Sequence, residues 1–390
     1  MVLSHPFHCP TQVIEGHAYG EAVASLLGGR GWALITSQGW PARGIMDELA
    51  RKGIEPAALL AHVPPNPKVS SILRLVEDLP DIEVVVAFGG GSVLDAAKGA
   101  IALKALDGDM AALMAHLRNN VALPDHMAPI PMIAVPTTSG TGSEVTRWGT
   151  LWGDDEVKHS INDAKLYPAH AVLDPVLCTS MPAELTLGTA LDALSHAMES
   201  VWNRRHTALT DELAARAIRL IKQNLAPTLA HPADVELRRR MQTAALIAGL
   251  AMATTQTALA HSISYPFTAK LSLPHGFACG FTLAEVARYN LAEDARRLEP
   301  IAAALDCPPG DVPQTLETWF TGLGVGDVLR RYVTRSFIEG LKDDLINRAR
   351  AANNIRDIDG PAARQLALAA FNKLCPAETF NADAASRQLA

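Results

Sequence analysis

Residues 83–103 read EVVVAFGGGSVLDAAKGAIAL, and this segment indicates how the chain begins to fold. The apolar run 83–88 has the composition of a strand buried on both faces, as in parallel sheets. The glycines at 89–91 predict a loop, and a helix is expected to begin near Ser92. Backbone N–H groups at a helix start can hold a phosphate, and glycine lets it approach closely. The pattern is not G-x-G-x-x-G, so a tight turn without a ligand is the competing interpretation.

The segments on either side repeat the alternation of strand and helix. WALIT at 32–36 and PMIAV at 131–135 predict two further strands, and a helix is expected around 41–52. Strands separated by helices are typical of a parallel, doubly wound sheet. The sequence therefore predicts an α/β nucleotide-binding domain over 1–182.

Strand-like runs disappear beyond Pro182. Residues 209–225, 236–262 and 362–374 instead carry apolar side chains close to helical spacing. The sequence therefore predicts an all-α domain over 183–390.

Composition excludes several classes of protein. Of the 390 residues 48% are hydrophobic, which allows a large core, and 34 basic against 41 acidic residues give a net charge of −7. That balance argues against nucleic-acid binding, which needs clustered positive charge.

The uncharged stretch 241–260 is rich in alanine and threonine, which favours a buried helix over a membrane span. No signal peptide is recognised at the N-terminus, and five scattered cysteines indicate a reducing, cytoplasmic location.

A second loop with ligand-binding character follows the strand expected at 131–135. It reads PTTSGTGSEVT over 136–146, and its hydroxyls suit hydrogen bonds to a ribose or pyrophosphate. A solvated loop is the alternative interpretation. Loops at the carboxyl ends of parallel strands lie where open α/β sheets bind ligands, which favours the first.

Four residues in the second half form a candidate metal site. Asp192 and His196 are four residues apart and so share a helix face, and His261 and His275 follow downstream. One carboxylate and three imidazoles match a four-coordinate site for Fe²⁺ or Zn²⁺. Each residue alone is ordinarily part of a core or a surface, and spacing does not show that the two pairs converge.

These pieces together resemble the iron-containing (group III) alcohol dehydrogenase family. The matching motifs are GGGSVLDAAK, PTTSGTGSEVT, Lys158, DALSH at 192–196, and His261 with LPHG at 273–276, over about residues 10 to 355. The resemblance implies a nucleotide-binding domain, a helical domain, and a cleft between them for a nicotinamide cofactor and a metal, Fe²⁺ with Zn²⁺ as the alternative. It also implies a cytoplasmic homodimer that acts on a small aldehyde or alcohol.

The resemblance assigns roles to individual residues. It places the metal ligands at Asp192, His196, His261 and His275. It places the cofactor at Ser37, Asn66, Gly90, Gly91, Ser92, Asp95, Thr137, Thr138, Thr141, Thr146 and Lys158, with Lys158 near the nicotinamide ribose.

The chain departs from the family pattern at two positions. Tyr265 stands where many members have a histidine, and a phenol with a pKa near 10 is a poorer proton shuttle at neutral pH. Ser37 stands where members that prefer NAD have an aspartate, which would repel a 2′-phosphate. NADPH use, or use of both NADH and NADPH, is therefore expected, and Tyr265 and Lys158 are the candidate catalytic residues.

The segments SEVTRWGTLW at 143–152 and HSISYPFTA at 261–269 resemble the branch of the family associated with phosphonate metabolism. That resemblance implies reduction of phosphonoacetaldehyde to 2-hydroxyethylphosphonate. A phosphonate needs cationic partners, for which the candidates are Arg147, Lys158, His159 and Lys270. For Arg147 an ordinary surface position is the alternative.

Other reactions remain open. One is reduction of another small aldehyde or of maleylacetate. Another is a lyase or cyclase resembling dehydroquinate synthase, in which NAD is recycled within each turnover and its absorbance does not change. A binding protein that keeps the fold without catalysis is the third alternative, against which the presence of all four metal-ligand residues argues.

Overall fold

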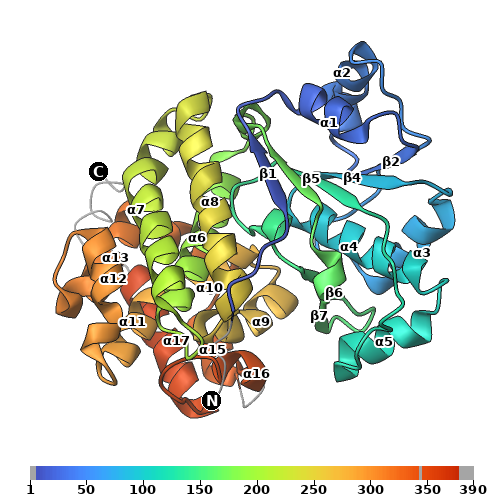
Figure 1. Ribbon diagram of the computed structural model, residues 1–390. Helices are drawn as coiled ribbons and strands as arrows, with labels where there is room; N and C mark the ends of the chain where they lie inside the picture. Colours follow the sequence, from blue (N-terminus) through green and yellow to red (C-terminus); the bar gives the residue numbers. More distant parts are fainter. Residues whose placement is uncertain (1–5, 342–344, 377–390) are drawn as a thin grey trace, which may run out of the picture.

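The computed structural model describes residues 6–341 and 345–376. Two parts lie side by side, an α/β part from the first half of the chain and a helical part from the second (Figure 1). This is the architecture that the sequence predicts, and secondary structure changes from strands to helices around Pro182, which precedes helix α6 (Ala183–Val201).

The α/β part contains a six-stranded sheet with the order β1-β8-β5-β4-β2-β3, and every neighbouring pair in it is parallel. Its strands are β1 (Gln12–Glu15), β2 (Trp32–Thr36), β3 (Ala58–Leu60), β4 (Val84–Gly89), β5 (Met132–Pro136) and β8 (His170–Leu173). Its helices are α1 (Tyr19–Leu27), α2 (Ile45–Arg51), α3 (Val69–Asp78), α4 (Gly91–Ala105) and α5 (Met110–Asn119).

The two faces of the sheet pack against different helices. Leu34 and Val86 belong to the core that includes α1 and α2, whereas Ile35 and Val85 belong to the core that includes α3, α4 and α5. Successive side chains of a strand point to opposite faces, so a strand covered on both sides must be apolar throughout. This requirement explains why the runs at 32–36 and 83–88 could be recognised as strands.

The three strands expected from the sequence are present as β2, β4 and β5, to within one residue at each end. Strands β1, β3 and β8 were not predicted. Strand β1 is largely exposed and β3 has three residues, so neither has a long apolar run. The antiparallel hairpin of β6 (Trp148–Trp152) and β7 (Lys158–Asn162) was also not predicted.

The helical part is built around α6, which packs against α7 (Ala208–Ala230), α8 (Val235–Thr255) and α10 (His275–Gly280). The remaining helices are α9 (Leu259–Leu271), α11 (Leu283–Leu291), α12 (Glu299–Leu305), α13 (Val312–Gly322), α14 (Val325–Tyr332), α15 (Arg335–Gly340), α16 (Arg348–Ala351) and α17 (Gly360–Leu374). The part of the predicted second domain beyond residue 376 lies outside the described residues.

The prediction of one continuous helix over 236–262 is wrong. Gln256 has a φ of 65°, in the left-handed region, and it separates α8 from α9, whose axes are bent by 107°. Within the described residues no single helix is long and apolar enough to cross a bilayer, and α8 with α9 meets that test only as this bent pair. The bend carries His261, near the start of α9, toward α6.

Candidate metal and cofactor site

A cavity of about 840 Å³ lies between the carboxyl ends of the parallel strands and the helices α6, α9 and α10. After β2 the chain continues to β3 on one side of the sheet, and after β4 it continues to β5 on the other side. The direction in which the chain adds strands therefore reverses between β2 and β4. Doubly wound sheets bind ligands at such a switch point. Ser37 after β2 and Gly90 after β4 both line the cavity there.

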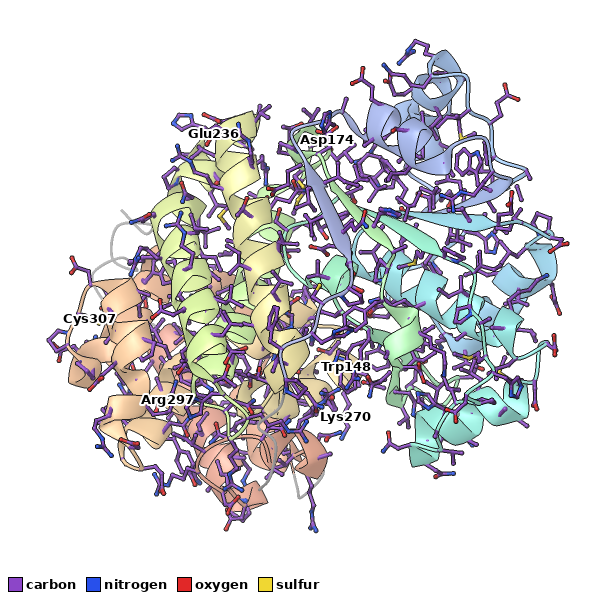
Figure 2. All side chains as sticks on the ribbon, in the orientation of Figure 1. Trp148, Asp174, Glu236, Lys270, Arg297 and Cys307 are labelled. Carbon is purple, nitrogen blue, oxygen red and sulfur yellow. The ribbon has the colours of Figure 1, made fainter. Side chains whose placement is uncertain are left out.

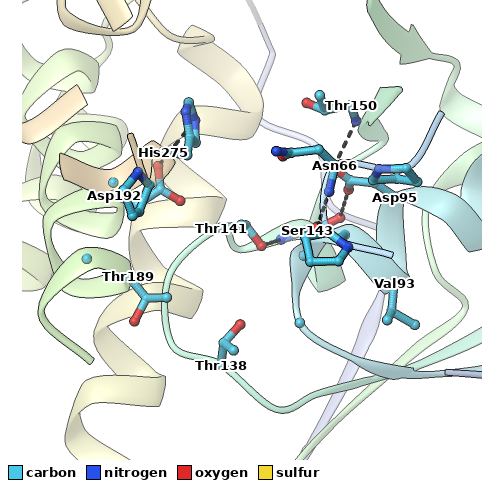
Figure 3. A pocket seen from close by; sticks show the side chains of 18 of the residues that line it. Asn66, Val93, Asp95, Thr138, Thr141, Ser143, Thr150, Thr189, Asp192 and His275 are labelled. Carbon is cyan, nitrogen blue, oxygen red and sulfur yellow. Dashed lines mark hydrogen bonds and ion pairs between the residues drawn. The ribbon is translucent and has the colours of Figure 1, made fainter. Parts of the chain in front are cut away.

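Every residue that the sequence assigned to cofactor binding lines this cavity. The set comprises Ser37, Asn66, Gly90, Gly91, Ser92, Asp95, Thr137, Thr138, Thr141, Thr146 and Lys158. Figure 3 shows Asp95 and Ser143 on the side of the sheet, across the cavity from Asp192 and His275 on the helical side.

The glycine loop fits an anion at the start of α4. Gly90 precedes the helix, and no side chain caps the N–H groups of its first turn. Such N–H groups are the donors that a phosphate uses at a helix N-terminus. A Cβ atom at Gly91 would lie 2.5 Å from Thr141, and one at Gly90 would lie 3.2 Å from Thr138. The close approach of the threonine-rich loop therefore also favours glycine at 91, and it leaves little room for a side chain at 90.

Asp95 acts by positioning the second loop. Its two carboxylate oxygens accept from the Ser143 hydroxyl at 2.7 Å and from the Thr150 N–H at 2.8 Å. Lys98, one turn later on α4, is buried and donates to the backbone oxygens of Ser143 and Trp148, each at 2.7 Å. Burial lowers the pKa of Lys98 to about 8. Lys98 was not identified from the sequence, where its signal is a lone lysine in an apolar helix.

The four candidate metal ligands meet at the other side of the cavity. From Asp192 Oδ1, the distances to Nε2 of His196, His261 and His275 are 3.7, 3.6 and 3.7 Å. A tetrahedral ion with bonds of about 2.1 Å separates its ligand atoms by about 3.4 Å, close to this spacing. Asp192 Oδ1 and His261 Nε2 are buried and lack a hydrogen-bond partner within the described chain. A divalent cation would satisfy both atoms, so the residues fit the metal.

Burial and mutual charge set the protonation of this cluster. Burial lowers the pKa of His196 to about 4, and burial with the nearby Lys158 ammonium lowers the pKa of His275 well below its usual value. Burial alone would raise the pKa of Asp192, but the three surrounding imidazoles outweigh it and hold that pKa low. Asp192 is therefore anionic and His196 and His275 are neutral. Burial alone would lower the pKa of His261, but the charges of Cys279 and Glu199 outweigh burial and raise that pKa well above its usual value, so a metal would displace a proton from His261.

Two further residues at this cluster were missed by the sequence analysis. Glu199 lies one turn after His196 on α6, and its Oε2 is 2.6 Å from His261 Nδ1. Cys279 lies one turn after His275 on α10, with its Sγ 3.6 Å from both ring nitrogens of that histidine. Helical spacing from the ligands was the signal that could have found both.

Tyr265 also lies at this end of the cavity, between two cations. The Lys158 ammonium is 5.0 Å from the centre of the Tyr265 ring, and the Arg350 guanidinium is near enough for its charge to act on the Tyr265 hydroxyl. Burial alone would raise the pKa of Tyr265, but the charges of Lys158 and Arg350 outweigh burial and lower it. Arg350, on α16, was not identified from the sequence.

Arg147, His159 and Lys270, the other candidates for substrate binding, do not line the cavity in the described part of the chain, and their role in binding a substrate stays a prediction. On strand β7 alternate side chains point to opposite sides. Lys158 therefore lines the cavity, as predicted, whereas His159 faces away from it and is buried.

Arg147 and Lys270 lie outside the cavity at different places. The Arg147 guanidinium lies 5.5 Å from the centre of the Trp148 ring. Lys270 is exposed near the end of α9, at the edge of the helical part (Figure 2). It is five residues beyond Tyr265, a spacing that places it on a different face of the helix.

Two family models match most of the chain. The model described as iron-containing alcohol dehydrogenase matches residues 10–175. The model for the C-terminal part of the Fe-containing alcohol dehydrogenase family matches residues 186–335. The matched regions contain the two cofactor loops and the four candidate metal ligands.

Individual proteins show the same likeness. A 1,3-propanediol dehydrogenase of Klebsiella pneumoniae is 34% identical over 286 residues, which are 71% of this chain and 72% of that protein. A phosphonoacetaldehyde reductase of Streptomyces viridochromogenes is 33% identical over 298 residues, covering 71% of this chain and 74% of that protein. A sulfoacetaldehyde reductase from Bifidobacterium kashiwanohense, solved with NAD⁺, superimposes with a TM-score of 0.79 at 28% identity, covering 96% of this chain and 99% of that one.

Proposed function

This chain belongs to the iron-containing alcohol dehydrogenase family, and on that premise we propose that it reduces phosphonoacetaldehyde to 2-hydroxyethylphosphonate. One aldehyde, one NAD(P)H and one proton give one primary alcohol and one NAD(P)⁺. Oxidation of a small alcohol is the reverse of the same reaction.

One observation supports metal-assisted hydride transfer as the type of reaction. The four candidate metal ligands face the same cavity as the two loops suited to a dinucleotide, so a metal and a nicotinamide can meet a substrate there. When bound, the metal would polarise a carbonyl oxygen and the reduced nicotinamide would supply hydride.

The chain's own residues orient these groups. Asp192 and the three histidines would hold the metal, and Glu199 orients His261 among them. The N–H groups at the start of α4 and the hydroxyls of the second loop would bind the cofactor phosphates and ribose. The Tyr265 hydroxyl is the proposed proton donor to the product alcohol oxygen, because Tyr265 lines the cavity and the charges of Lys158 and Arg350 favour loss of its proton.

The substrate proposal is supported by two kinds of observation. Two relatives are a phosphonoacetaldehyde reductase and a sulfoacetaldehyde reductase, by their names enzymes that act on small aldehydes with a terminal anion. Cationic side chains of Lys158 and Arg350 line the substrate end of the cavity. Maleylacetate, a keto acid, and uncharged aldehydes are the competing substrates, the latter because other relatives are propanediol and propanol dehydrogenases.

The test is cofactor oxidation followed by the loss of reduced-nicotinamide absorbance. Purified protein loaded with Fe²⁺ or with Zn²⁺ is given phosphonoacetaldehyde, acetaldehyde, glycolaldehyde or maleylacetate, each with NADH and with NADPH. Turnover that is fastest with phosphonoacetaldehyde supports the proposal. Turnover confined to the other substrates keeps the reductase and rejects the phosphonate. Absence of turnover on all four by metal-loaded protein rejects the proposed reaction.

We extend the proposal to assembly and location. A homodimer in the cytoplasm is expected from family resemblance, and the five cysteines are free thiols, as a reducing compartment would keep them. Light scattering after size-exclusion chromatography tests the dimer, and fractionation of the source cells tests the location.

A further inference from the structure

Among the described residues, three cations that line the cavity form no ion pair: Arg43, which donates to the Ser180 hydroxyl and lies over the Trp40 ring, and Lys158 and Arg350 near Tyr265. Three acidic residues also line the cavity, and each is engaged elsewhere. Asp95 holds the second loop, Glu184 pairs with Arg331, and Asp192 faces the three histidines. Near Tyr265 the two positive charges of Lys158 and Arg350 therefore lie at the cavity without an ion-pair partner among the described residues.

Arg350 is held where it can receive a ligand. Its Nη2 donates to the Ser160 hydroxyl of β7 at 3.1 Å, and its Cζ lies 5.3 Å from the centre of the Trp148 ring. These two contacts hold the guanidinium against the β6–β7 hairpin. A guanidinium has five N–H donors, so further donors remain for an anion.

A third polar group in the same cavity also lacks a partner. Thr268 lines the cavity one turn beyond Tyr265 on α9, and it is 7% exposed. Its hydroxyl is buried and has no hydrogen-bond partner among the described residues. Buried hydroxyls are nearly always paired, so an unpaired one facing a cavity indicates a ligand atom.

We propose that Arg350, together with Lys158 and Thr268, binds the terminal oxyanion of the substrate while its aldehyde faces the metal ligands. The substrate class is a short aldehyde that ends in a phosphonate, sulfonate or carboxylate. This inference rests on the proposed reductase function and adds the residue that selects among aldehydes. Lys158 also lies near the cofactor site, so Arg350 is the residue that distinguishes substrates.

The chemistry favours a tetrahedral oxyanion of high charge. Guanidinium groups bind phosphonate-like oxygens through two parallel hydrogen bonds, which a lysine at the same place could not reproduce. Two cations with no protein counter-charge bind a dianion better than a monoanion. Phosphonoacetaldehyde is therefore expected to be a better substrate than sulfoacetaldehyde, and both are expected to be better than propanal.

The variants are Arg350→Met, Arg350→Lys and Thr268→Val, with Arg348→Met as the matched control. Arg348 is on the same helix, α16, but is exposed and does not line the cavity. Arg350→Met should lower kcat/KM for phosphonoacetaldehyde by about 100-fold more than it lowers kcat/KM for propanal, because any effect through Tyr265 on proton transfer falls on both substrates alike. Arg350→Lys should retain part of the preference for phosphonoacetaldehyde over propanal. Thr268→Val should lower kcat/KM for phosphonoacetaldehyde by about tenfold. Arg348→Met should change neither substrate.

A binding measurement gives a second readout that does not need turnover. Calorimetric titration of 2-hydroxyethylphosphonate into the metal- and cofactor-loaded enzyme should detect binding that Arg350→Met weakens by about 100-fold. The dissociation constant for NADPH, measured by fluorescence, should stay unchanged in that variant.

The outcomes separate this inference from the proposed function. Equal loss of activity on phosphonoacetaldehyde and propanal in Arg350→Met would overturn the inference, because Arg350 would then act on structure or on the shared chemistry. A native enzyme that prefers propanal would also overturn it, while the reductase function would stand. No turnover on any aldehyde, with Arg350-dependent binding of the phosphonate retained, would reject the reductase and support the anion site.

Discussion

Glu199 holds His261 at two points. Its Oε2 lies 2.6 Å from His261 Nδ1, and its Oε1 accepts from the His261 backbone N–H at 3.1 Å. The same carboxylate accepts from the Ala258 N–H at 2.9 Å, so it also caps the start of α9. One buried side chain on α6 therefore fixes both the backbone and the imidazole of a candidate metal ligand, directing Nε2 toward Asp192.

Glu199→Gln should weaken metal binding. Glu199 accepts from the Ala258 N–H, the His261 N–H and His261 Nδ1. The NH₂ group of a glutamine would face one of these donors, so His261 would lose its orientation and its preferred tautomer. Outer partners of this kind contribute about 10- to 100-fold to metal affinity. The metal dissociation constant is measured by competition with a chelator. Glu285→Gln, a buried glutamate paired with Arg288, is the control, and equal weakening by both variants would contradict a specific role for Glu199.

Cys279→Ser should change the spectrum of the Co²⁺-loaded protein. Ligand atoms of Asp192, His261, His275 and Cys279 all lie within 4.8 Å of one another, so the thiol is within reach of an ion held by the others. Thiolate coordination gives a sulfur-to-cobalt charge-transfer band in the near ultraviolet, and we expect this band in the native protein and not in the variant. Cys178→Ser is the control, because Cys178 is buried beside Ser139. Identical spectra for native protein and Cys279→Ser would exclude the thiol from coordination.

Tyr265→Phe should remove one limb of the pH profile. The charges of Lys158 and Arg350 outweigh burial and hold the pKa of Tyr265 below its ordinary value of 10.0. If the phenol donates the proton, aldehyde reduction falls as pH rises through that pKa, and alcohol oxidation rises over the same range. The variant should be slower by about 100-fold and should lack this limb. Tyr289→Phe, on α11, is the control; an unchanged profile in Tyr265→Phe would assign the proton to another donor.

Glu144→Gln should alter how stability depends on pH. Burial raises the pKa of Glu144 from 4.5 to about 7, so the folded protein binds more protons than the unfolded chain between these values. The contribution of Glu144 to the free energy of unfolding is fully present below about pH 4.5. It falls by about 3 kcal/mol as the pH rises to about 7. The free energy of unfolding in urea, measured at about pH 5 and pH 7, should fall less in the variant. Glu184→Gln, at a partly exposed glutamate, is the control and should keep the native slope.

Ser37→Asp should weaken NADPH binding by about tenfold or more and leave NADH binding nearly unchanged. Ser37 lines the cavity directly after β2, at the switch point of the sheet. A carboxylate there would repel a 2′-phosphate and accept from a 2′-hydroxyl. Dissociation constants from fluorescence titration measure both cofactors. Equal effects on NADH and NADPH would place Ser37 away from the ribose.

Much of the fold could be predicted because its signals are local. Strands β2, β4 and β5 are apolar on both faces, and that property is written in five or six consecutive residues. The edge strand β1 is largely exposed and has no such run. The break at Gln256 has no local signal, and the N–H groups at the start of α9 that follow it are accepted by Glu199, a residue about sixty positions earlier.

The sequence by itself determined which kinds of side chain this protein carries and how they are spaced along single elements. These include two loops suited to a dinucleotide, an aspartate and a histidine on one helix face, and two more histidines downstream. Only the tertiary structure decided which of them meet. In the folded chain Arg350 donates a hydrogen bond to Ser160, which lies 190 residues earlier. His159 faces away from the cavity that Lys158 lines, and Glu199 contacts His261. The physical reason is that backbone preferences act between neighbours in sequence, whereas a binding site requires charges and donors to converge in space through the packing of the whole chain.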